Sequence, residues 1–309
     1  MTSDAHVTSI VEAVAKWRVI RIDRGWSTLR SIESDDESRV RNIGADVAVG
    51  DIVTIDGERV TNVLPRTSAI TRRRSGEGTR AQRDVIAANV DVVLVVQAAD
   101  QEVNPRRIER ELTVALDSMA APVLVLNKCD LVSPDLLAER MEEVRAVSAG
   151  VPVHAVSATT REGLSGLIDH LPAGSAIALI GASGVGKSSL ANALSSSQQQ
   201  MTGEVREGDQ RGRHTTTAAE LIELPNGRWL VDTPGLRVVS LWLSGRGIER
   251  AFPEIFALAD SCKFRDCKHE TEPGCAVADA IRSGHLDAKR LASMKELVAE
   301  EAELEELME

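Results

Sequence analysis

The segment GASGVGKSS, residues 181–189, combines glycines, a lysine and serines at the spacing of a phosphate-binding loop. Its glycines allow consecutive backbone N–H groups to turn toward phosphate oxygens, and the helix that follows adds a favourable dipole. Lys187 can contact the β- and γ-phosphates, and the Ser188 hydroxyl can ligate Mg²⁺. The pattern predicts a nucleoside triphosphate site. Its expected contacts are Gly181, Ala182, Ser183, Gly184, Val185, Gly186, Lys187, Ser188 and Ser189.

A second segment, PVLVLNKCDL at residues 122–131, predicts which base this site accepts. The Asp130 carboxylate can accept hydrogen bonds from the ring N–H and the exocyclic amine of guanine. Adenine presents an acceptor and no amine at that edge, so ATP would leave the carboxylate unpaired. Asn127 and Lys128 are expected to support the loop and cover the base, and Cys129 fills the variable position. The sequence therefore favours GTP over ATP.

Two further segments complete the expected contacts with the nucleotide. Ser157 and Ala158, which follow the strand-like run VPVHA, would meet guanine through their backbone. In DTPG, residues 232–235, Asp232 can hold Mg²⁺ through its water shell and the N–H of Gly235 can meet the γ-phosphate. Both segments follow apolar runs, as expected of loops at the ends of strands.

The segment RHTTT, residues 213–217, lies where a switch that senses the γ-phosphate would belong. One of its threonines should ligate Mg²⁺. The spacing to Glu220 favours Thr216, but Thr215 and Thr217 remain open. Leu236 occupies the position at which Ras-like enzymes carry a water-orienting glutamine, so we expect slow intrinsic hydrolysis. His214 is the candidate catalytic group beside Lys187.

The order of these five segments is unusual, because the guanine loop precedes the phosphate loop by 54 residues, counted from Asn127 to Gly181. Since every segment follows a predicted strand, chance does not explain the order. A circular permutation of a GTPase domain does, and it is physically permitted because domain termini tend to lie close together. LPAGS, residues 171–175, would be the splice.

A further set of residues, outside these five segments, has the spacing of a metal site. CKFRDCKHETEPGC, residues 262–275, supplies three thiolates and one imidazole, the donor set of a closed, structural zinc site. The alternative is three reduced cysteines in a helical core. The expected ligands of this single zinc ion are Cys262, Cys267, His269 and Cys275.

The elements around these segments predict a multi-domain protein. Residues 1–70 show short alternating strands and fit a small all-β barrel, for which an OB-fold is favoured over an SH3-like barrel. Its aromatic residues, Trp17 and Trp26, are expected in the core. Residues 71–84 form an arginine-rich segment interpreted as a mobile connection. Apolar strands alternate with helices over 85–238, which predicts an α/β domain with a mainly parallel sheet. Residues 239–309 are helical in pattern.

Composition excludes several classes. Of the 309 residues 43% are apolar, no run approaches the roughly 18–20 residues of a membrane span, and the cysteine pattern suits a reducing cytoplasm. The net charge of −11 argues against a uniformly basic nucleic-acid binder, although residues 1–83 alone are net positive. We expect a cytoplasmic monomer that does not associate with membranes.

The combination of VAVGD, VLPR, AANVDVV, NKCD, GASGVGKSS, GRHTTT, DTPG and CxFRDCxHxxEPGC resembles the ribosome small subunit-dependent GTPase A family (RsgA/YjeQ) over essentially the whole chain. The resemblance implies an OB-fold, a circularly permuted P-loop GTPase domain and a C-terminal α-helical zinc-binding domain. It implies a factor that acts late in maturation of the small (30S) ribosomal subunit, with GTP hydrolysis stimulated by that subunit.

The resemblance also implies that the barrel contacts 16S rRNA. Because aromatic residues are scarce, contacts with phosphates and with RNA shape are expected rather than base reading. The candidates are Arg72, Arg73, Arg74, Arg80 and Arg83, and a merely solvated linker is the alternative. Two other functions remain in view. One is a nucleotide-gated RNA-binding module in which hydrolysis is incidental, and the other is an ATP-dependent kinase, against which NKCD argues.

Overall fold

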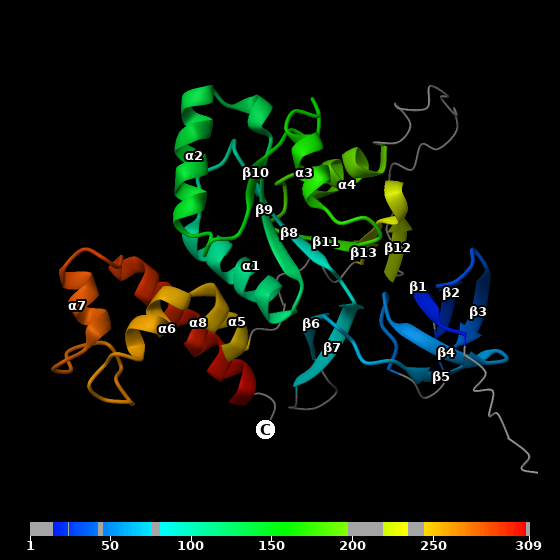
Figure 1. Ribbon diagram of the computed structural model, residues 1–309, viewed down its shortest axis with the longest axis horizontal. Coiled ribbons are helices and arrows are strands. Elements are labelled where there is room, and N and C mark those ends of the chain that lie inside the picture. The colour runs from blue at the N-terminus through cyan, green and yellow to red at the C-terminus, as the bar shows by residue number, and fades with distance from the viewer. Residues whose placement is uncertain are drawn as a thin grey trace, which may run out of the picture.

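The computed structural model describes residues 15–23, 25–42, 46–75, 81–196, 219–233 and 244–306. A β-barrel, an α/β domain and a group of C-terminal helices follow one another along the chain (Figure 1). Several residues singled out in the sequence lie outside the described ranges: Arg80, His214, Thr215, Thr216, Thr217, Gly235 and Leu236.

The barrel contains five strands and has the closed order expected of an OB-like fold. Its strands are β1 (Trp17–Asp23), β2 (Trp26–Ser31), β3 (Glu37–Arg41), β4 (Ile52–Asp56) and β5 (Arg59–Val63). β1 pairs with both β2 and β4, and β3 pairs with β5, so that the sheet closes on itself. Inward-facing residues fill a small core made of Val19, Leu29, Val40, Val53 and Val60. The prediction of an OB-type barrel is confirmed.

The two tryptophans of the barrel differ in position. Trp17 packs against the barrel core, as predicted. The prediction for Trp26 is wrong, because the alternation along β2 buries Ser27 and Leu29 and places Trp26 on the outer face. There its ring lies beneath the guanidinium groups of Arg39 and Arg41, at 5.3 and 4.8 Å from the ring centroid.

The arginine-rich segment is not the mobile connection that its composition suggested. Most of it belongs to an antiparallel hairpin of β6 (Ala69–Ser75) and β7 (Ala81–Ala88), which forms a separate two-stranded sheet. Buried Ile70 and Ala87 anchor its base, and Arg72 pairs with Asp84 across the strands at 3.0 Å. A run of neighbouring arginines is therefore compatible with a strand here, because the base of the hairpin is buried and the two strands pair along their length.

The α/β domain has the mainly parallel sheet that was predicted. Its strands are β8 (Val92–Ala98), β9 (Ala121–Asn127), β10 (Val153–Ala155), β11 (Ala176–Ile180), β12 (Ala219–Glu223) and β13 (Trp229–Asp232). They lie in the order β10-β9-β8-β11-β13-β12, and β12 alone of these runs antiparallel to its neighbour. The splice at 171–175 connects α3 directly to β11, as the permutation requires.

Helices cover both faces of this sheet, which explains its continuous apolar strands. They are α1 (Pro105–Asp117), α2 (Pro134–Ala146), α3 (Leu164–His170) and α4 (Lys187–Ser195), with short 3-10 turns η1 (Cys129–Leu131) and η3 (Pro225–Gly227). One face packs with α1, α2 and the C-terminal helices, and the other with α3 and α4. Successive residues of β8 alternate between the two cores, so that Val93 and Val95 face α1 while Leu94 faces α4.

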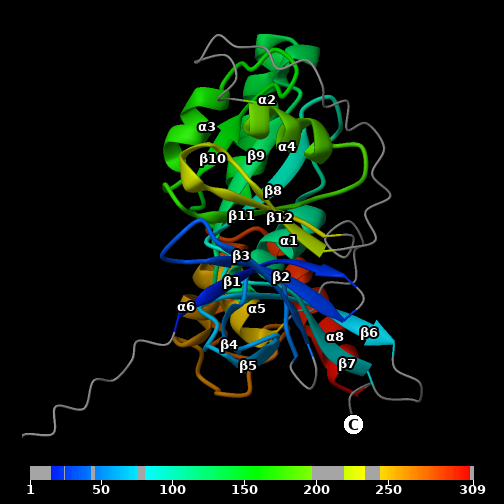
Figure 2. The ribbon, with the colours of Figure 1, turned by 90° about the vertical axis from the view of Figure 1, so that its right-hand side faces the viewer.

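The C-terminal helices dock on α1. They are α5 (Gly245–Ala251), α6 (Pro253–Ala259), α7 (Ala276–Arg282) and α8 (Ala288–Glu306), and α5 and α8 lie beside α1 in both views (Figures 1 and 2). The side chain of Arg290 on α8 is 10% exposed and lies 2.6 Å from the carboxylate of Glu109 on α1, whose side chain is 3% exposed. Within the described ranges no helix is long and apolar enough to cross a membrane.

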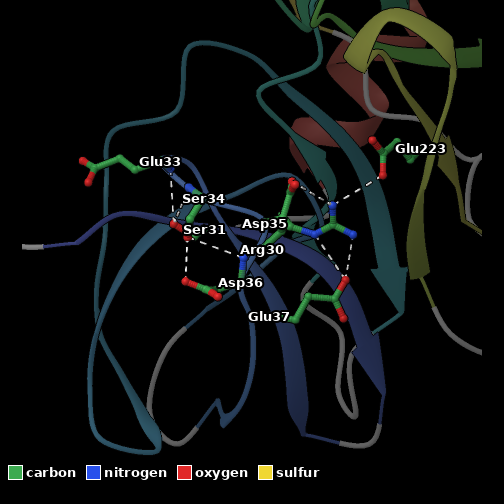
Figure 3. A network of polar contacts seen from close by, with 8 residues as sticks. All are labelled: Arg30, Ser31, Glu33, Ser34, Asp35, Asp36, Glu37 and Glu223. Carbon is green, nitrogen blue, oxygen red and sulfur yellow. Dashed lines mark hydrogen bonds and ion pairs between the residues drawn. The ribbon is translucent and has the colours of Figure 1, made fainter.

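The barrel continues the sheet of the α/β domain, because β1 also pairs with β12. Figure 3 shows Arg30 of β2 at this boundary, between carboxylates from both sides. Its guanidinium lies 2.8 Å from Glu37 in the barrel and 3.4 Å from Glu223 at the end of β12. The guanidinium also lies over the ring of Trp229, at the start of β13. The strand that leaves the predicted switch at 213–217 is thus joined to the barrel.

Two sequence motifs that carried the resemblance meet where the barrel contacts the β6–β7 hairpin. Asp51 of VAVGD is fully buried and accepts hydrogen bonds from Arg66 of VLPR, with the closer Nε–Oδ1 distance 2.7 Å. This hydrogen bond raises the pKa of Arg66. Gly50 has a positive φ of 90°, and a Cβ there would lie 2.0 Å from the carbonyl oxygen of Ala88 at the end of β7. Only glycine allows the two backbones to approach so closely.

Candidate functional site

The phosphate-binding loop joins β11 to α4, in the strand–loop–helix setting that its sequence predicted. Gly181, Gly184 and Gly186 all have positive φ. A Cβ on Gly181 would lie 2.3 Å from the carbonyl oxygen of Val96 in the neighbouring strand, so that position requires glycine. The loop therefore curls over the carboxyl edge of the sheet, where ligands of open α/β domains bind.

Lys187 lies back across this loop at the first turn of α4. Its Nζ donates to the carbonyl oxygens of Gly181 and Ala182, at 2.8 and 2.6 Å. Ser188 and Ser189 follow it and are exposed. The lysine side chain is thus held within the loop where a phosphate would be bound.

Asn127 brings three of the predicted segments together. Its amide nitrogen donates to the carbonyl oxygen of Val185 in the phosphate loop at 3.0 Å, and its amide oxygen accepts from the N–H of Ala158 at 3.1 Å. The side chain is buried, so both contacts are made away from solvent. Segments separated by 58 and 31 residues are therefore joined by one amide.

The remaining residues of the guanine loop are fixed through the backbone. The N–H of Cys129 donates to the carbonyl oxygen of Val156 at 3.1 Å, and burial raises the pKa of the Cys129 thiol. Asp130 is exposed at the edge of the loop. Ser157 is fully buried, and its hydroxyl accepts from the N–H of Thr160 at 2.9 Å. The carboxylate of Asp130 is thus available to a ligand while the loop beneath it is held.

Asp232 ends β13, which runs parallel to β11. The two strands therefore deliver Asp232 and the phosphate loop to the same edge of the sheet. Thr233, next along DTPG, is buried. The other predicted contacts, Thr216 and Gly235, and the candidate catalytic residue His214 lie outside the described residues.

Sequence reasoning missed two acidic residues at this edge. Glu111 on α1 accepts from the side-chain amide of Gln97 at 2.6 Å. Burial raises the pKa of Glu111 to about 7, against the opposing effects of the Gln97 hydrogen bond and of the charges of Arg107, Lys187 and Arg110. Asp100, in the loop after β8, lies 3.0 Å from the Nζ of Lys128. Neither residue belongs to a motif. The sequence offered one indication for Glu111. It lies one helical turn after the buried Ile108, so both side chains are on the same face of α1.

The cysteine–histidine cluster forms outside the α/β domain, between α6 and α7. The Nδ1 of His269 lies 3.6 Å from the Sγ of Cys262 and 3.5 Å from that of Cys275, and these two sulfurs are 3.9 Å apart. One donor atom from each of the four predicted residues lies within 4.8 Å of every other. The three separations of 3.5–3.9 Å are close to the edges, roughly 3.3–3.8 Å long, of a tetrahedron with metal bonds of about 2.0–2.3 Å. The cluster is therefore compatible with one zinc ion.

Comparison with known proteins agrees with this arrangement. The sequence profile of the RsgA GTPase family matches residues 63–242. A protein from Methanosarcina acetivorans named small ribosomal subunit biogenesis GTPase RsgA is 41% identical over 275 residues, which span 87% of this chain and 73% of the relative. A protein of the same name from Streptomyces coelicolor is 40% identical over 314 residues, covering 96% of this chain and 83% of the relative.

Two solved structures share the fold. The crystal structure of YjeQ from Thermotoga maritima superposes with a TM-score of 0.68 and 26% identity, covering 93% of this chain and 98% of that one. The structure of YloQ, described as a circularly permuted GTPase, gives a TM-score of 0.67 at 23% identity, covering 97% of this chain and 98% of that one. The profile match, the relatives and the permuted order of the motifs agree, and the chain belongs to the RsgA family of circularly permuted GTPases.

Proposed function

We propose that this GTPase binds the small (30S) ribosomal subunit, acts late in its maturation and hydrolyses GTP faster when bound to it. The names of its relatives support the ribosomal role. The observation that carries the nucleotide assignment is the buried Asn127 amide, which joins the guanine loop to the phosphate loop and to Ala158. Guanine would meet Asp130 and the backbone of Ser157 and Ala158.

The phosphates would lie on the loop at 181–189, where Lys187 would exchange its carbonyl partners for phosphate oxygens. Ser188, Asp232 and Thr216 would hold Mg²⁺, which when bound neutralises charge on the β- and γ-phosphates. His214 would orient the attacking water once the subunit has docked, because Leu236 offers no group that can do so. After hydrolysis, the GDP-bound protein would differ from the GTP-bound protein in its affinity for the subunit.

The outer face of the barrel is the proposed surface for 16S rRNA. A hollow of about 220 Å³ there is lined by Arg21, Asp23, Trp26, Thr28 and Arg39. The β2–β3 face of an OB-fold is a common site for oligonucleotides. Arginines above a tryptophan can contact phosphates and also stack with bases. Arg72 is a weaker candidate than it first seemed, because Asp84 neutralises it.

The cluster of Cys262, Cys267, His269 and Cys275 would hold one structural zinc ion. Four protein donors leave no open position for water or substrate, so the ion would stabilise the C-terminal helices rather than take part in hydrolysis. The protein is proposed to act as a cytoplasmic monomer in which the subunit itself supplies the large binding surface.

The turnover of GTP with and without purified 30S subunits tests this function. We expect subunits to raise turnover by at least roughly tenfold, and 50S subunits, used as a matched control, to have no such effect. A Lys187→Ala protein should lose turnover under both conditions. Equal turnover with and without 30S subunits would refute the proposal, and a His214→Ala protein with full stimulation would remove His214 from the mechanism.

A further inference from the structure

The loop after β8 places an acidic side chain beside the guanine loop. β8 and β9 are parallel neighbours with Ala98 opposite Asn127, and the N–H of Ala99 donates to the carbonyl oxygen of Asn127 at 2.8 Å. Asp100 and Lys128 therefore leave adjacent strands at the same edge of the sheet. The Nζ of Lys128 lies 3.0 Å from Oδ2 and 3.3 Å from Oδ1 of Asp100, so the ammonium meets both carboxylate oxygens.

The backbone of Lys128 is already fixed on both sides. Asn127 before it is held by its buried amide contacts, and the N–H of Cys129 after it is bonded to Val156. Lys128 itself has left-handed backbone angles, with φ 64° and ψ 33°. The loop therefore determines the direction in which the Lys128 side chain leaves the backbone, and Asp100 determines where the end of this long, flexible side chain lies.

We propose that Asp100 is a positioning residue that holds the Lys128 side chain in place to cover the guanine base before the nucleotide arrives. This inference rests on the proposed assignment of residues 127–130 to the guanine loop. A lysine stem has many rotamers, and ordering it on binding would reduce affinity. Because the ion pair with Asp100 already orders the lysine in the folded protein, nucleotide binding would not carry this entropic cost.

A positioning role for Asp100 can be distinguished from that of a surface ion pair without function. Both side chains are about one-quarter to one-third exposed, at 30% for Asp100 and 26% for Lys128, and exposed pairs contribute little to stability. A positioning role instead predicts an effect on affinity. Since the base is common to GTP and GDP, affinity for both should fall by the same factor, while the rate of hydrolysis at saturating GTP should not change.

The test measures dissociation constants for GDP and for a non-hydrolysable GTP analogue. In Asp100→Asn both should rise roughly fivefold, the factor that corresponds to ~1 kcal/mol. The KM for GTP should rise in parallel and kcat should stay constant. Asp100→Glu, which keeps the charge, should restore most of the affinity. Glu143→Gln is the control, because it breaks an Arg140–Glu143 pair of 2.8 Å on α2, away from the nucleotide loops.

A double-mutant cycle with Lys128→Met shows whether Asp100 acts through the lysine. We expect Asp100→Asn to have no further effect once Lys128 is replaced. Unchanged affinity in Asp100→Asn, or effects that simply add in the double variant, would overturn the inference. Normal affinity in both Lys128→Met and Asp130→Asn would instead refute the guanine-loop assignment itself. Urea midpoints of all variants should match, because a loss of affinity accompanied by unfolding would contradict a positioning role.

Discussion

At the scale of single residues, Asn127 connects the loops that are assigned to the nucleotide site. Its two amide contacts join loops that the permutation has moved apart in the chain. Gly186 shows how tightly the loops are packed, because a Cβ there would lie 2.3 Å from the Asn127 amide nitrogen. The guanine and phosphate loops therefore act as one unit, whatever their order in the sequence.

Replacing Asn127 by alanine should weaken the binding of GDP and GTP by at least roughly tenfold. The change removes two buried hydrogen bonds and leaves the carbonyl oxygen of Val185 and the N–H of Ala158 without a partner, at about 1–3 kcal/mol each. Titration with a fluorescent guanine nucleotide measures the effect. Asn62→Ala, which alters an exposed amide on β5, should bind as the wild type does. An unchanged Asn127→Ala protein would contradict the role of this amide.

Glu111 should make stability depend on pH. Its pKa is about 7 in the folded protein, above the value of 4.5 for an unperturbed carboxyl. Between these values the folded state holds a proton that the unfolded state has lost, so the free energy of unfolding falls as pH rises. The loss amounts to on the order of 3 kcal/mol. Urea midpoints measured from pH 4.5 to 7.5 should fall more for the wild type than for Glu111→Gln, and parallel curves would count against this assignment.

The sequence was sufficient to predict that the motif residues lie together. It did not predict the residues that surround them, Asp100 and Glu111. Asn127, Lys187 and Asp232 could be placed because each follows a buried strand, and parallel strands deliver such loops to one edge. Asp100 also follows a buried strand, β8, but it belongs to no motif, and Glu111 lies within a helix. Their positions depend on the path of the β8–α1 loop and on the rotation of α1, which local pattern does not determine.

At the scale of elements, close packing of helix α5 on helix α1 depends on a glycine. A Cβ on Gly247 would lie 2.6 Å from the carbonyl oxygen of Thr113 and 2.7 Å from the Cβ of Asp117. At the start of α5, Ser244 donates to the carboxylate of Asp117. The segment that follows DTPG is thus anchored on α1 at its far end.

Gly247→Val should lower the free energy of unfolding by about 1–3 kcal/mol, because the added methyl groups force the two helices apart. Gly166→Ala on α3 is the matched control, since a Cβ there meets nothing within 4 Å. That change should be neutral or stabilising by up to about 1 kcal/mol. Urea denaturation measures both, and equal midpoints for the two variants would show that the contact between α5 and α1 does not require glycine.

The β6–β7 hairpin shows where sequence pattern fails for elements. Charged residues at neighbouring positions suggested a connection, yet the strands pair from Ala69 opposite Ala88 to Ser75 opposite Ala81. The hairpin is stabilised by its buried base and by pairing along its two strands. The alternation of apolar and polar residues in the sequence reveals neither feature. The buried strands of the α/β domain were predicted well because both of their faces are covered.

At the scale of the whole molecule, the two flanking parts are attached to the GTPase domain at different places. The barrel joins β12, the strand that leaves the segment 213–217. The C-terminal helices join α1, where Arg290 lies between Glu109 and Glu254 and over the ring of Phe252. The barrel is therefore attached to the strand that follows the segment 213–217, and the C-terminal helices are attached to α1.

Breaking the buried pair should loosen the C-terminal helices. Glu109→Gln removes one of the two carboxylates that pair with Arg290, and since Glu254 still pairs with the guanidinium the cost should stay below the roughly 3–5 kcal/mol of a fully broken buried pair. Hydrogen exchange of α8 should become faster, while exchange in the barrel should not change. Glu296→Gln is the control, because it breaks an exposed pair with Arg106 on the same two helices. Equal protection of α8 in both variants would contradict this docking.

Residues 127–130, 157–158 and 181–189 are assigned to one guanine nucleotide site despite their permuted order. The most direct test is the affinity of the wild type and of Asp130→Asn for GTP, ATP and XTP. The wild type should prefer GTP over ATP by at least roughly 10³-fold. Asp130→Asn should lose affinity for GTP and gain it for XTP, whose carbonyl can accept from the asparagine amide. A wild type that binds ATP as tightly as GTP, or a variant with unchanged base preference, would contradict this assignment.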